Sequence, residues 1–384
     1  MNILRLAPLK SDKSGIADYS SIFDEILKLK QFKVIKAKYF FSNRSTWWLP
    51  LDFILRNKYW QELLNNVDII HAEIGVHQAI EILTLYYLIK KRKKLKIYVT
   101  FHDPGADCYR IFKIHYDTSG SFISKVIAKI ADKVEPLINN LFFNRVIDYI
   151  LEQSIIVFVF NQWGAQRLLA KNPKIKGNIK VINHPVFNLK RKEIKKIIGR
   201  KILFAGFWSK DKGIELLIQT YYFLRKKWGN KIPSLILAGE PQMPKSSYCR
   251  QIKKLVNSLS LDYLVDFPGF LEEDKLSDVL SKAILVIPYG NKMSASASGI
   301  YIRGLQAGAV TIVANTPTLT SFVGDNNISL IFKHGEVKDL SNKISQLLRD
   351  PKLAYRIAKN GQDFIYEYGN WKRLGKLMTN IYRN

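Results

Sequence analysis

Twelve short runs rich in β-branched and aromatic residues, separated by longer segments with helical spacing of apolar residues, limit the folds open to this chain more than any other feature. Strands that alternate with helices form parallel sheets with crossover helices. We therefore predict an α/β protein made of two doubly wound, Rossmann-like halves. The predicted strands are residues 2–6, 33–36, 67–71, 96–101, 155–160 and 180–183 in the first half, and 201–205, 234–238, 265–267, 283–287, 311–314 and 329–332 in the second.

A basic stretch with little apolar periodicity separates the two halves. Residues 188–200 have the composition of a linker. We expect one domain over residues 1–187 and a second over residues 201–365, facing each other across a cleft, and a helical ending after Phe332. Open α/β sheets bind ligands beyond the carboxyl ends of their strands, so functional residues should lie in the loops that follow the strands.

The composition excludes several classes of protein. An apolar fraction of 47% argues against a disordered chain. Two cysteines, Cys108 and Cys249, are too few for a disulfide framework or a four-thiolate zinc site. No apolar run reaches the roughly 18 residues of a membrane span, and the first residues lack the apolar region of a signal peptide. We expect a cytoplasmic protein.

The net charge of +28, from 60 Lys and Arg against 32 Asp and Glu, raises the question of a polyanionic partner. Nucleic acid is one alternative, because cationic surfaces gain affinity by releasing counterions. However, the cations are spread over the whole chain and no zinc finger, RNP motif or helix-turn-helix signature is present. We expect no nucleic-acid partner and favour an anionic membrane surface.

A loop rich in serine and glycine follows the predicted strand at 283–287 and opens a short helix. Ser298 is a suitable N-cap, which would leave the amides of Gly299, Ile300 and Tyr301 as unpaired donors at the positive end of the helix. Such a helix end binds phosphate. A capped helix with no ligand is the alternative.

A second loop, residues 206–213, joins the predicted strand at 201–205 to the next helix. It carries Ser209, Lys210 and Lys212, and it follows a strand of the same predicted sheet. A lysine in a basic protein is usually solvated surface, but here the position after a strand favours a role at the phosphate site.

Several short motifs, in order along nearly the whole chain, together resemble GT-B glycosyltransferases of the large family four, the glycosyl transferases group 1. Gly15 lies in the first of these motifs, His102 in the second, and Lys212 in the segment that resembles the donor-phosphate lysine motif. The motifs are Ser14-Gly15-Ile16-Ala17-Asp18-Tyr19-Ser20, Val99 to Pro104, Val181 to Pro185, Leu203 to Phe207 with Lys212-Gly213, Leu237 to Glu240, and Leu347 to Asp350 through Trp371 to Tyr382.

The resemblance implies transfer of a hexose from a nucleotide-diphosphate sugar to a glycan acceptor, with retention of the anomeric configuration, in cell-surface polysaccharide or lipopolysaccharide assembly. It also implies that the last helix, about residues 366–384, returns to the first domain. A catalytically silent GT-B scaffold, or a regulatory protein that binds nucleotide sugars, is the alternative.

The chain departs from the family pattern at one position pair. In many relatives two glutamates eight positions apart flank the donor-binding helix, and here those positions fall at about Ala295 and Arg303. No carboxylate occurs between Asp278 and Asp325. The segment Ser296-Ala297-Ser298-Gly299 resembles a branch of the family that has Ser-x-Ser-Gly in this place.

The leaving group of such a reaction is a diphosphate, and the sequence contains no Asp-x-Asp pair to hold a metal against it. We therefore expect no metal and no cofactor. Fixed cations and helix-end amides would stabilise the developing charge. We assign that role to Lys212, to the amides of Gly299 and Ile300, and to Arg303, whose guanidinium can bind phosphate through two hydrogen bonds.

The remaining candidates also follow predicted strands. Gly15 would let backbone approach the donor, and His102 would contact the donor sugar, its ring oriented by Asp103. His71 and Glu73, with His77, are placed in an acceptor-side loop. Further donor-side candidates are Glu240 near the base or ribose, Phe270 and Leu271 near the base, Tyr289 near the sugar, and Ser296.

Residues 121–134 predict an amphipathic helix with apolar residues on one stripe and Lys125, Lys129 and Lys133 on another. Interfacial aromatic residues beside Arg56 and Lys58 would add to a membrane-facing surface. They are Trp47, Trp48, Phe53, Tyr59 and Trp60. Packing of these residues on the core of the first domain is the alternative. A membrane-facing surface would suit a lipid-linked acceptor.

Overall fold

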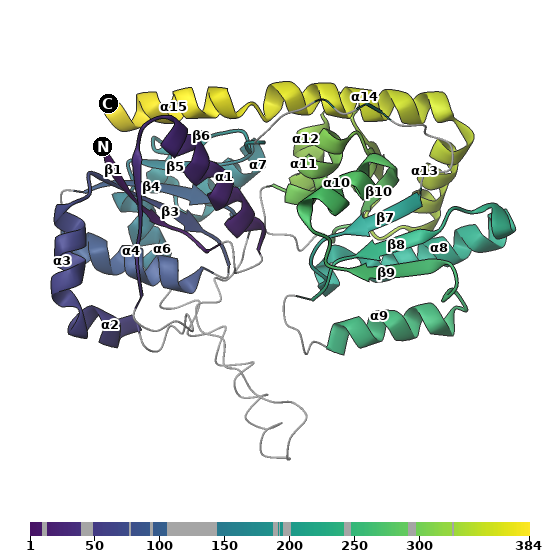
Figure 1. Ribbon diagram of the computed structural model, residues 1–384, viewed down its shortest axis with the longest axis horizontal. Coiled ribbons are helices and arrows are strands. Elements are labelled where there is room, and N and C mark those ends of the chain that lie inside the picture. Colours follow the sequence, from purple (N-terminus) through teal and green to yellow (C-terminus); the bar gives the residue numbers. More distant parts are fainter. Residues whose placement is uncertain are drawn as a thin grey trace, which may run out of the picture. The chain divides into compact units, whose positions relative to one another are not determined.

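The computed structural model describes most of the chain as two compact units (Figure 1). Unit 1 comprises Met1–Pro185 with Trp371–Asn384, and unit 2 comprises the described part of residues 186–370. The described residues are 1–9, 14–39, 49–76, 78–92, 95–105, 144–186, 191, 193–194, 201–241, 247–290, 297–324 and 326–384.

Unit 1 is built on a six-stranded parallel sheet in the order β2-β1-β3-β4-β5-β6. The strands are β1 (Asn2–Leu6), β2 (Lys33–Lys36), β3 (Ile69–Ile74), β4 (Lys96–Phe101), β5 (Ile156–Val159) and β6 (Ile179–Val181). The helices of this unit are α1 (Gly15–Leu29), α2 (Leu49–Leu55), α3 (Asn57–Asn65), α4 (Ala79–Lys91), α6 (Asn144–Gln153), α7 (Gln162–Lys171) and α15 (Trp371–Arg383).

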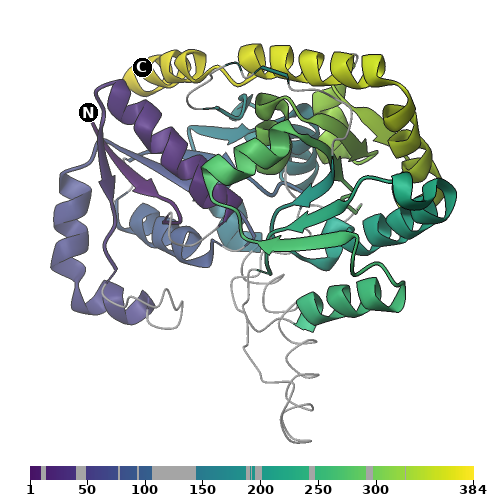
Figure 2. The ribbon, with the colours of Figure 1, turned by 45° about the vertical axis from the view of Figure 1, so that its right-hand side comes forward.

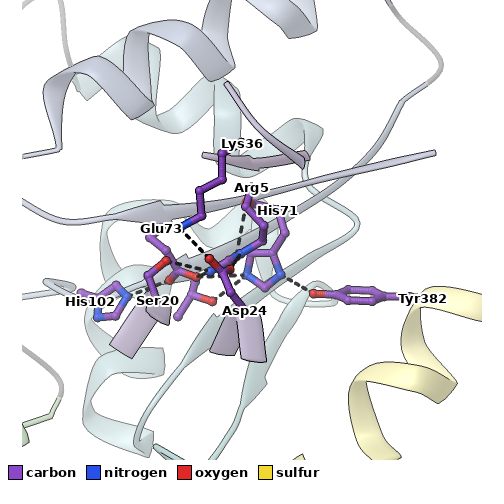
Figure 3. Close-up of polar contacts among 9 residues, drawn as sticks. Arg5, Ser20, Asp24, Lys36, His71, Glu73, His102 and Tyr382 are labelled. Carbon is purple, nitrogen blue, oxygen red and sulfur yellow. Dashed lines mark hydrogen bonds and ion pairs between the residues drawn. The ribbon is translucent and has the colours of Figure 1, made fainter. Parts of the chain in front are cut away.

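The two faces of this sheet differ in chemistry. Successive side chains of a strand point to opposite faces, so Ile70, Ala72 and Ile74 of β3 join the apolar core with residues of α4 and α6. The alternate residues, His71 and Glu73, point to the face that α1 and α15 cover (Figures 1 and 3). The face covered by α1 and α15 therefore holds the buried charged residues of β1 and β3, Arg5 and Glu73.

Helix α15 belongs to unit 1 although unit 2 precedes it in the chain. It packs against α1, and Leu374, Met378 and Tyr382 are buried there. A side chain at Gly375 would overlap Lys30 and Ile26, so the glycine allows the two helices to approach closely.

Unit 2 repeats the architecture with the order β12-β11-β10-β7-β8-β9. Helices α8 and α13 pack together on one side of it, as Figure 2 shows. Its strands are β7 (Lys201–Ala205), β8 (Leu235–Ala238), β9 (Val265–Gly269), β10 (Ala283–Ile287), β11 (Val310–Ala314) and β12 (Leu330–Phe332). Its α-helices are α8 (Ile214–Trp228), α9 (Ser247–Ser258), α10 (Glu273–Ser281), α11 (Gly299–Ala307), α12 (Pro317–Val323), α13 (Val337–Arg349) and α14 (Pro351–Tyr368).

All twelve predicted strands are present, and the predicted α/β fold is confirmed. In each unit the strand order reverses once, between β1 and β3 in unit 1 and between β7 and β10 in unit 2. Ligands of open α/β sheets bind at this switch point, beyond the carboxyl ends of the strands. Among the described residues, no helix combines the length and apolar character needed to cross a membrane.

Candidate active site

Lys212 lies at the switch point of unit 2. It ends a single 3₁₀ turn, Lys210–Lys212, between β7 and α8, and its Nζ atom is 3.9 Å from the ring centroid of Tyr289, which follows β10. The hydroxyl of Tyr289 lies 3.2 Å from Ser298 Oγ. These contacts bring the ends of two adjacent strands and the start of α11 together.

The loop of Lys212 is fixed by the backbone. Gly213 has φ +69°, and a side chain there would overlap the carbonyl oxygen of Pro288. On the other side of the turn, the amide of Gly290 donates to the carbonyl of Asp211 at 2.8 Å. Because both contacts join the β7 loop to the end of β10, the position of Lys212 is set by the sheet itself.

Helix α11 begins as the sequence predicted, with Ser298 at the N-cap. The Ser298 side chain makes no capping hydrogen bond, because its hydroxyl is directed to Tyr289. The first amides of an α-helix have no acceptor within the helix, so those of Gly299 and Ile300 are suited to an anion. A side chain added at Gly299 would meet no atom within 4 Å, so packing does not require glycine at this position.

Arg303 is one turn into α11, where its Nη2 atom lies 3.0 Å from Oε2 of Glu273 in α10. Glu273 is two-thirds exposed, and an exposed ion pair contributes about 0–1 kcal/mol. A phosphate group could therefore replace Glu273 as the partner of Arg303 at low cost.

The other donor-side candidates lie at the same carboxyl edge of the unit 2 sheet. Ser209 precedes the turn of Lys210 and Lys212, and its carbonyl accepts from the Lys212 amide at 3.0 Å. Glu240 follows β8, and its carboxylate occupies the space that a side chain at Gly269, the last residue of β9, would approach. Phe270 and Leu271 come next, and the Phe270 side chain is 45% exposed. Ser296 lies outside the described residues.

Unit 1 holds a buried network of charged and polar side chains at its own switch point (Figure 3). Arg5 of β1 donates through Nε to Asp24 Oδ1 at 2.8 Å and through Nη2 to Glu73 Oε1. Lys36 contacts the other oxygen of Asp24 at 2.8 Å. Two cations therefore face two carboxylates, and the charges of these four groups cancel.

Two histidines extend this network in opposite directions. The ring of His102, just beyond β4, lies with Nε2 2.8 Å from Glu73 Oε2. His71 contacts Tyr382 of α15 through Nδ1 and Thr100 Oγ1 through Nε2, the latter at 2.7 Å. In Figure 3, His102 and Tyr382 lie at the two ends of the network.

The network fixes the charge state of its members. Burial alone would raise the pKa of Glu73, but the attraction of Arg5 and the hydrogen bond from His102 lower it to about 2. Burial and the nearby Arg5 guanidinium lower the pKa of His71 to about 3, so its ring is neutral at pH 7. Burial would lower the pKa of Arg5, yet Glu73 and Asp24 together hold it above its ordinary value.

One prediction about unit 1 is wrong. His71 and Glu73 do not lie in a loop, because β3 continues to Ile74 and both side chains are fully buried within it. Glu73 is in hydrogen-bond contact with the His102 ring, and Asp103 Oδ2 accepts from the backbone amide of Val76 at 2.8 Å. Gly15 is the first residue of α1, with no atom within 4 Å of an added side chain.

Two of the aromatic residues predicted at a membrane surface are also placed differently. Phe53 and Trp60 are buried and in contact with each other in unit 1, because their rings complete its apolar core. Tyr59 accepts from the amide of Lys38, with the Arg56 guanidinium over its ring. Trp47, Trp48, His77, the predicted helix at 121–134 and most of the predicted linker lie outside the described residues.

Sequence reasoning missed Arg5, Asp24 and Tyr382. One signal was available for Arg5, a charged residue inside the short apolar strand Asn2–Leu6. A buried charge requires a partner, so this residue predicts a carboxylate on a neighbouring strand or helix. Which carboxylate it is depends on the strand order, which no local motif encodes.

Comparisons with known proteins bear on the second unit and on the fold. Residues 187–364 match the family model described as glycosyl transferases group 1. No curated protein matches the chain.

Three solved structures illustrate the likeness in fold. Sucrose-phosphate synthase from Thermosynechococcus elongatus has a TM-score of 0.74 and 17% identity, covering 100% of this chain and 98% of its own. Anabaena HepE in complex with UDP and glucose has a TM-score of 0.70 and 14% identity over 99% of both chains. WaaG, a glycosyltransferase involved in lipopolysaccharide biosynthesis, has a TM-score of 0.64 and 11% identity, over 99% of this chain and 100% of its own. The predicted GT-B fold class is confirmed.

Proposed function

We propose that the chain is a glycosyltransferase with the GT-B fold, which moves a hexose from a nucleotide-diphosphate sugar to a glycan acceptor. The match of residues 187–364 to the glycosyl transferases group 1 model supports this proposal. One observation carries the proposal. Lys212 and Tyr289 are in contact at the switch point of unit 2, beside the start of α11. A cation and unpaired helix-end amides at this place suit the diphosphate of such a donor.

In the proposed mechanism the protein stabilises the leaving group. Breaking the bond between sugar and phosphate puts negative charge on the nucleotide diphosphate. Lys212, the amides of Gly299 and Ile300, and Arg303 supply fixed positive charge where it develops. Such preorganised groups need no reorganisation during the reaction, and loss of one typically costs ~10²- to 10³-fold in rate.

We propose a uridine-diphosphate donor. The support comes from the HepE structures, which contain UDP with glucose and UDP-glucose. Thermal-shift measurements with UDP and GDP test the base, because a ligand that binds only the folded state raises the unfolding temperature. Stabilisation by GDP and not by UDP would contradict the choice of base.

Replacement of Lys212 tests the site. We expect Lys212→Ala to lower the rate of transfer at least about tenfold, which corresponds to ~1.4 kcal/mol of transition-state stabilisation, with no loss of folding. Lys226→Ala is the matched control, because Lys226 also lies over a tyrosine ring, that of Tyr222, at 4.4 Å, but on the exposed side of α8. Transfer by a folded Lys212→Ala variant at the control rate would remove Lys212 from the mechanism.

Retention of configuration and independence from metal ions are further parts of the proposal. The anomeric signal of the fresh product, followed by NMR, distinguishes retention from inversion. Transfer measured in EDTA and with added Mg²⁺ or Mn²⁺ tests the metal. Activity that disappears with EDTA and returns with Mg²⁺ would contradict metal independence.

We also propose a lipid-linked acceptor reached at an anionic membrane surface. The support lies on α2, where Leu51, Ile54 and Leu55 are exposed, Ile54 by 73%, and Arg56 and Lys58 follow. Apolar residues flanked by cations suit an anionic bilayer, where each surface cation contributes about 1 kcal/mol.

Sedimentation with vesicles containing anionic phospholipid at low salt tests this surface. We expect the double variant Ile54→Ser with Leu55→Ser to bind the vesicles several-fold more weakly than the natural chain. Leu29→Ser is the control, because Leu29 is also exposed in unit 1 but lies at the end of α1. Equal vesicle binding by all three proteins would exclude α2 from the surface.

A further inference from the structure

Glu73 has a separate partner for each carboxylate oxygen. Oε1 accepts from Arg5, and Oε2 lies 2.8 Å from Nε2 of His102. The pair with Arg5 is sufficient to neutralise the carboxylate. The second contact joins the buried network to His102, which the sequence places in a family motif at the carboxyl edge of the sheet.

The chemistry of this contact determines where the His102 ring carries hydrogen. An ionised carboxylate can only accept hydrogen bonds, so Nε2 of His102 must be the donor. The Nε2–H form of the ring is therefore fixed by this contact. The rings of Tyr19 and Phe160, with centroids 5.0 and 5.2 Å from that of His102, restrict its rotation.

We propose that Glu73 is a positioning residue for His102: it holds the ring in the Nε2–H form and in one orientation. The role of His102 as a contact of the donor sugar rests on the proposed function. The interaction between Glu73 and His102 does not, because it is a property of unit 1.

Several charged or titratable groups surround this pair. Arg5 of β1 carries a positive charge and pairs with Oε1 of Glu73. His71 lies within 3.9 Å of Glu73 and is neutral at pH 7. Tyr19 of α1 is neutral as well, because burial raises its pKa well above the ordinary value. His184 packs on Tyr19 and Phe160, and Asp103 follows His102 in the chain. Glu73 Oε2 lies 2.8 Å from the ring nitrogen Nε2, and Asp103 Oδ2 accepts from the Val76 amide.

NMR of the histidine ring nitrogens tests the proposal in the full-length chain. In the natural protein at pH 8, we expect His102 in the Nε2–H form. In Glu73→Gln the amide oxygen can still accept from Nε2, but the negative charge is gone. We expect the share of the Nδ1–H form of His102 to rise several-fold, because a neutral amide is a weaker acceptor than a carboxylate. A His102 ring in the Nδ1–H form in the natural protein would overturn the proposal without any variant.

Asp24→Asn is the matched control. It removes the other carboxylate bound to Arg5, with comparable damage to the network, but leaves the contact between Glu73 and His102 in place. We expect the His102 ring in this variant to keep the Nε2–H form of the natural protein. Equal effects of Glu73→Gln and Asp24→Asn on the ring would overturn the proposal. If Glu73→Gln does not fold, Glu73→Asp replaces it and should retain the Nε2–H form.

Turnover gives a second readout. Glu73→Gln and His102→Gln should lower kcat by similar factors, and the double variant should be no slower than His102→Gln, since Glu73 acts through that ring. Independent, multiplied losses would overturn the positioning role. If the natural chain transfers no sugar, the proposed function fails, whereas the ring measurements still decide the role of Glu73.

Discussion

Single residues at the two switch points show how burial sets chemical state. His71 is enclosed in β3, with a hydroxyl at each ring nitrogen and a guanidinium nearby. Arg5 faces two carboxylates and remains charged. Neutral histidine and charged arginine within one network follow from the same rule, because each buried group keeps the state that its partners stabilise.

Acid should destabilise unit 1 well above the pH at which ordinary carboxylates titrate. The pKa of His71 falls from 6.5 to about 3 on folding, so between these values the unfolded chain binds one proton more than the folded chain. The contribution of His71 to the free energy of unfolding is therefore fully present above pH 6.5. It is lost as the pH falls towards 3, by up to ~1.4 kcal/mol per pH unit for one proton. Glu73, lowered from 4.5 to about 2, adds a loss of the same sign below pH 4.5.

Urea unfolding at pH 7.5 and 5.5 measures this loss. His71→Gln should be less stable at both values, but its stability should change less between them, because glutamine does not titrate. Equal pH dependence in both proteins would contradict the assignment to His71.

Gly299 offers a test of ligand approach. Since an added Cβ meets no atom within 4 Å, Gly299→Ala should leave stability unchanged or raise it by up to about 1 kcal/mol. Binding of UDP, measured by calorimetry, should weaken about tenfold or more, because the methyl group lies where the phosphate approaches the amides. Gly177→Ala is the control, since Gly177 has equally open space but lies in unit 1.

The sequence correctly places Lys212 in a loop after a strand and Ser298 and Gly299 at the start of a helix, because the signals for a loop and a helix start are local. It predicts the network of Arg5, His71 and Glu73 poorly. Arg5 and Glu73 are 68 residues apart, and they meet only because β1 pairs with β3. A sequence motif predicts the local structure around it, whereas the pairing of two buried residues far apart in the chain depends on the order of the strands in the sheet.

At the scale of elements, the loop between β7 and α8 depends on Gly213. Gly213→Ala adds a clash with Pro288 to the backbone strain of a positive φ. We expect a drop in unfolding temperature and weaker binding of UDP, both measured by thermal shift. Gly335→Ala separates the two effects, since Gly335 has φ +79° and nothing within 4 Å of an added Cβ. It should lose stability only by the strain, about 1–2 kcal/mol, with UDP binding retained.

Element boundaries show where a local pattern misleads. The sequence predicts a third strand over residues 67–71, ending at His71. It continues to Ile74, because Arg5, Thr100 and His102 satisfy the polar side chains. By contrast, β7 and β10 have the predicted ends, since both are apolar runs without a buried charge.

At the scale of the molecule, the two units have separate apolar cores. Arg5→Met should therefore destabilise unit 1 by ~3–5 kcal/mol, because it leaves Asp24 and Glu73 buried without their cation. In the Arg5→Met variant, UDP should still raise the unfolding temperature of unit 2. Differential scanning calorimetry with and without UDP measures both, and an equal loss of stability in both units would contradict their independence.

The connection of α15 to unit 1 has a consequence for biosynthesis. Tyr382 and Met378 fill the face of the first sheet, yet the ribosome makes them only after the whole of unit 2. Domains generally fold as units, N-terminal first, while the chain is being made. In this protein the order is different, because unit 1 is translated first but cannot complete its fold until α15 has been made. Until then the face of the sheet that carries Arg5 and Glu73 stays exposed to solvent, where a chaperone could bind it.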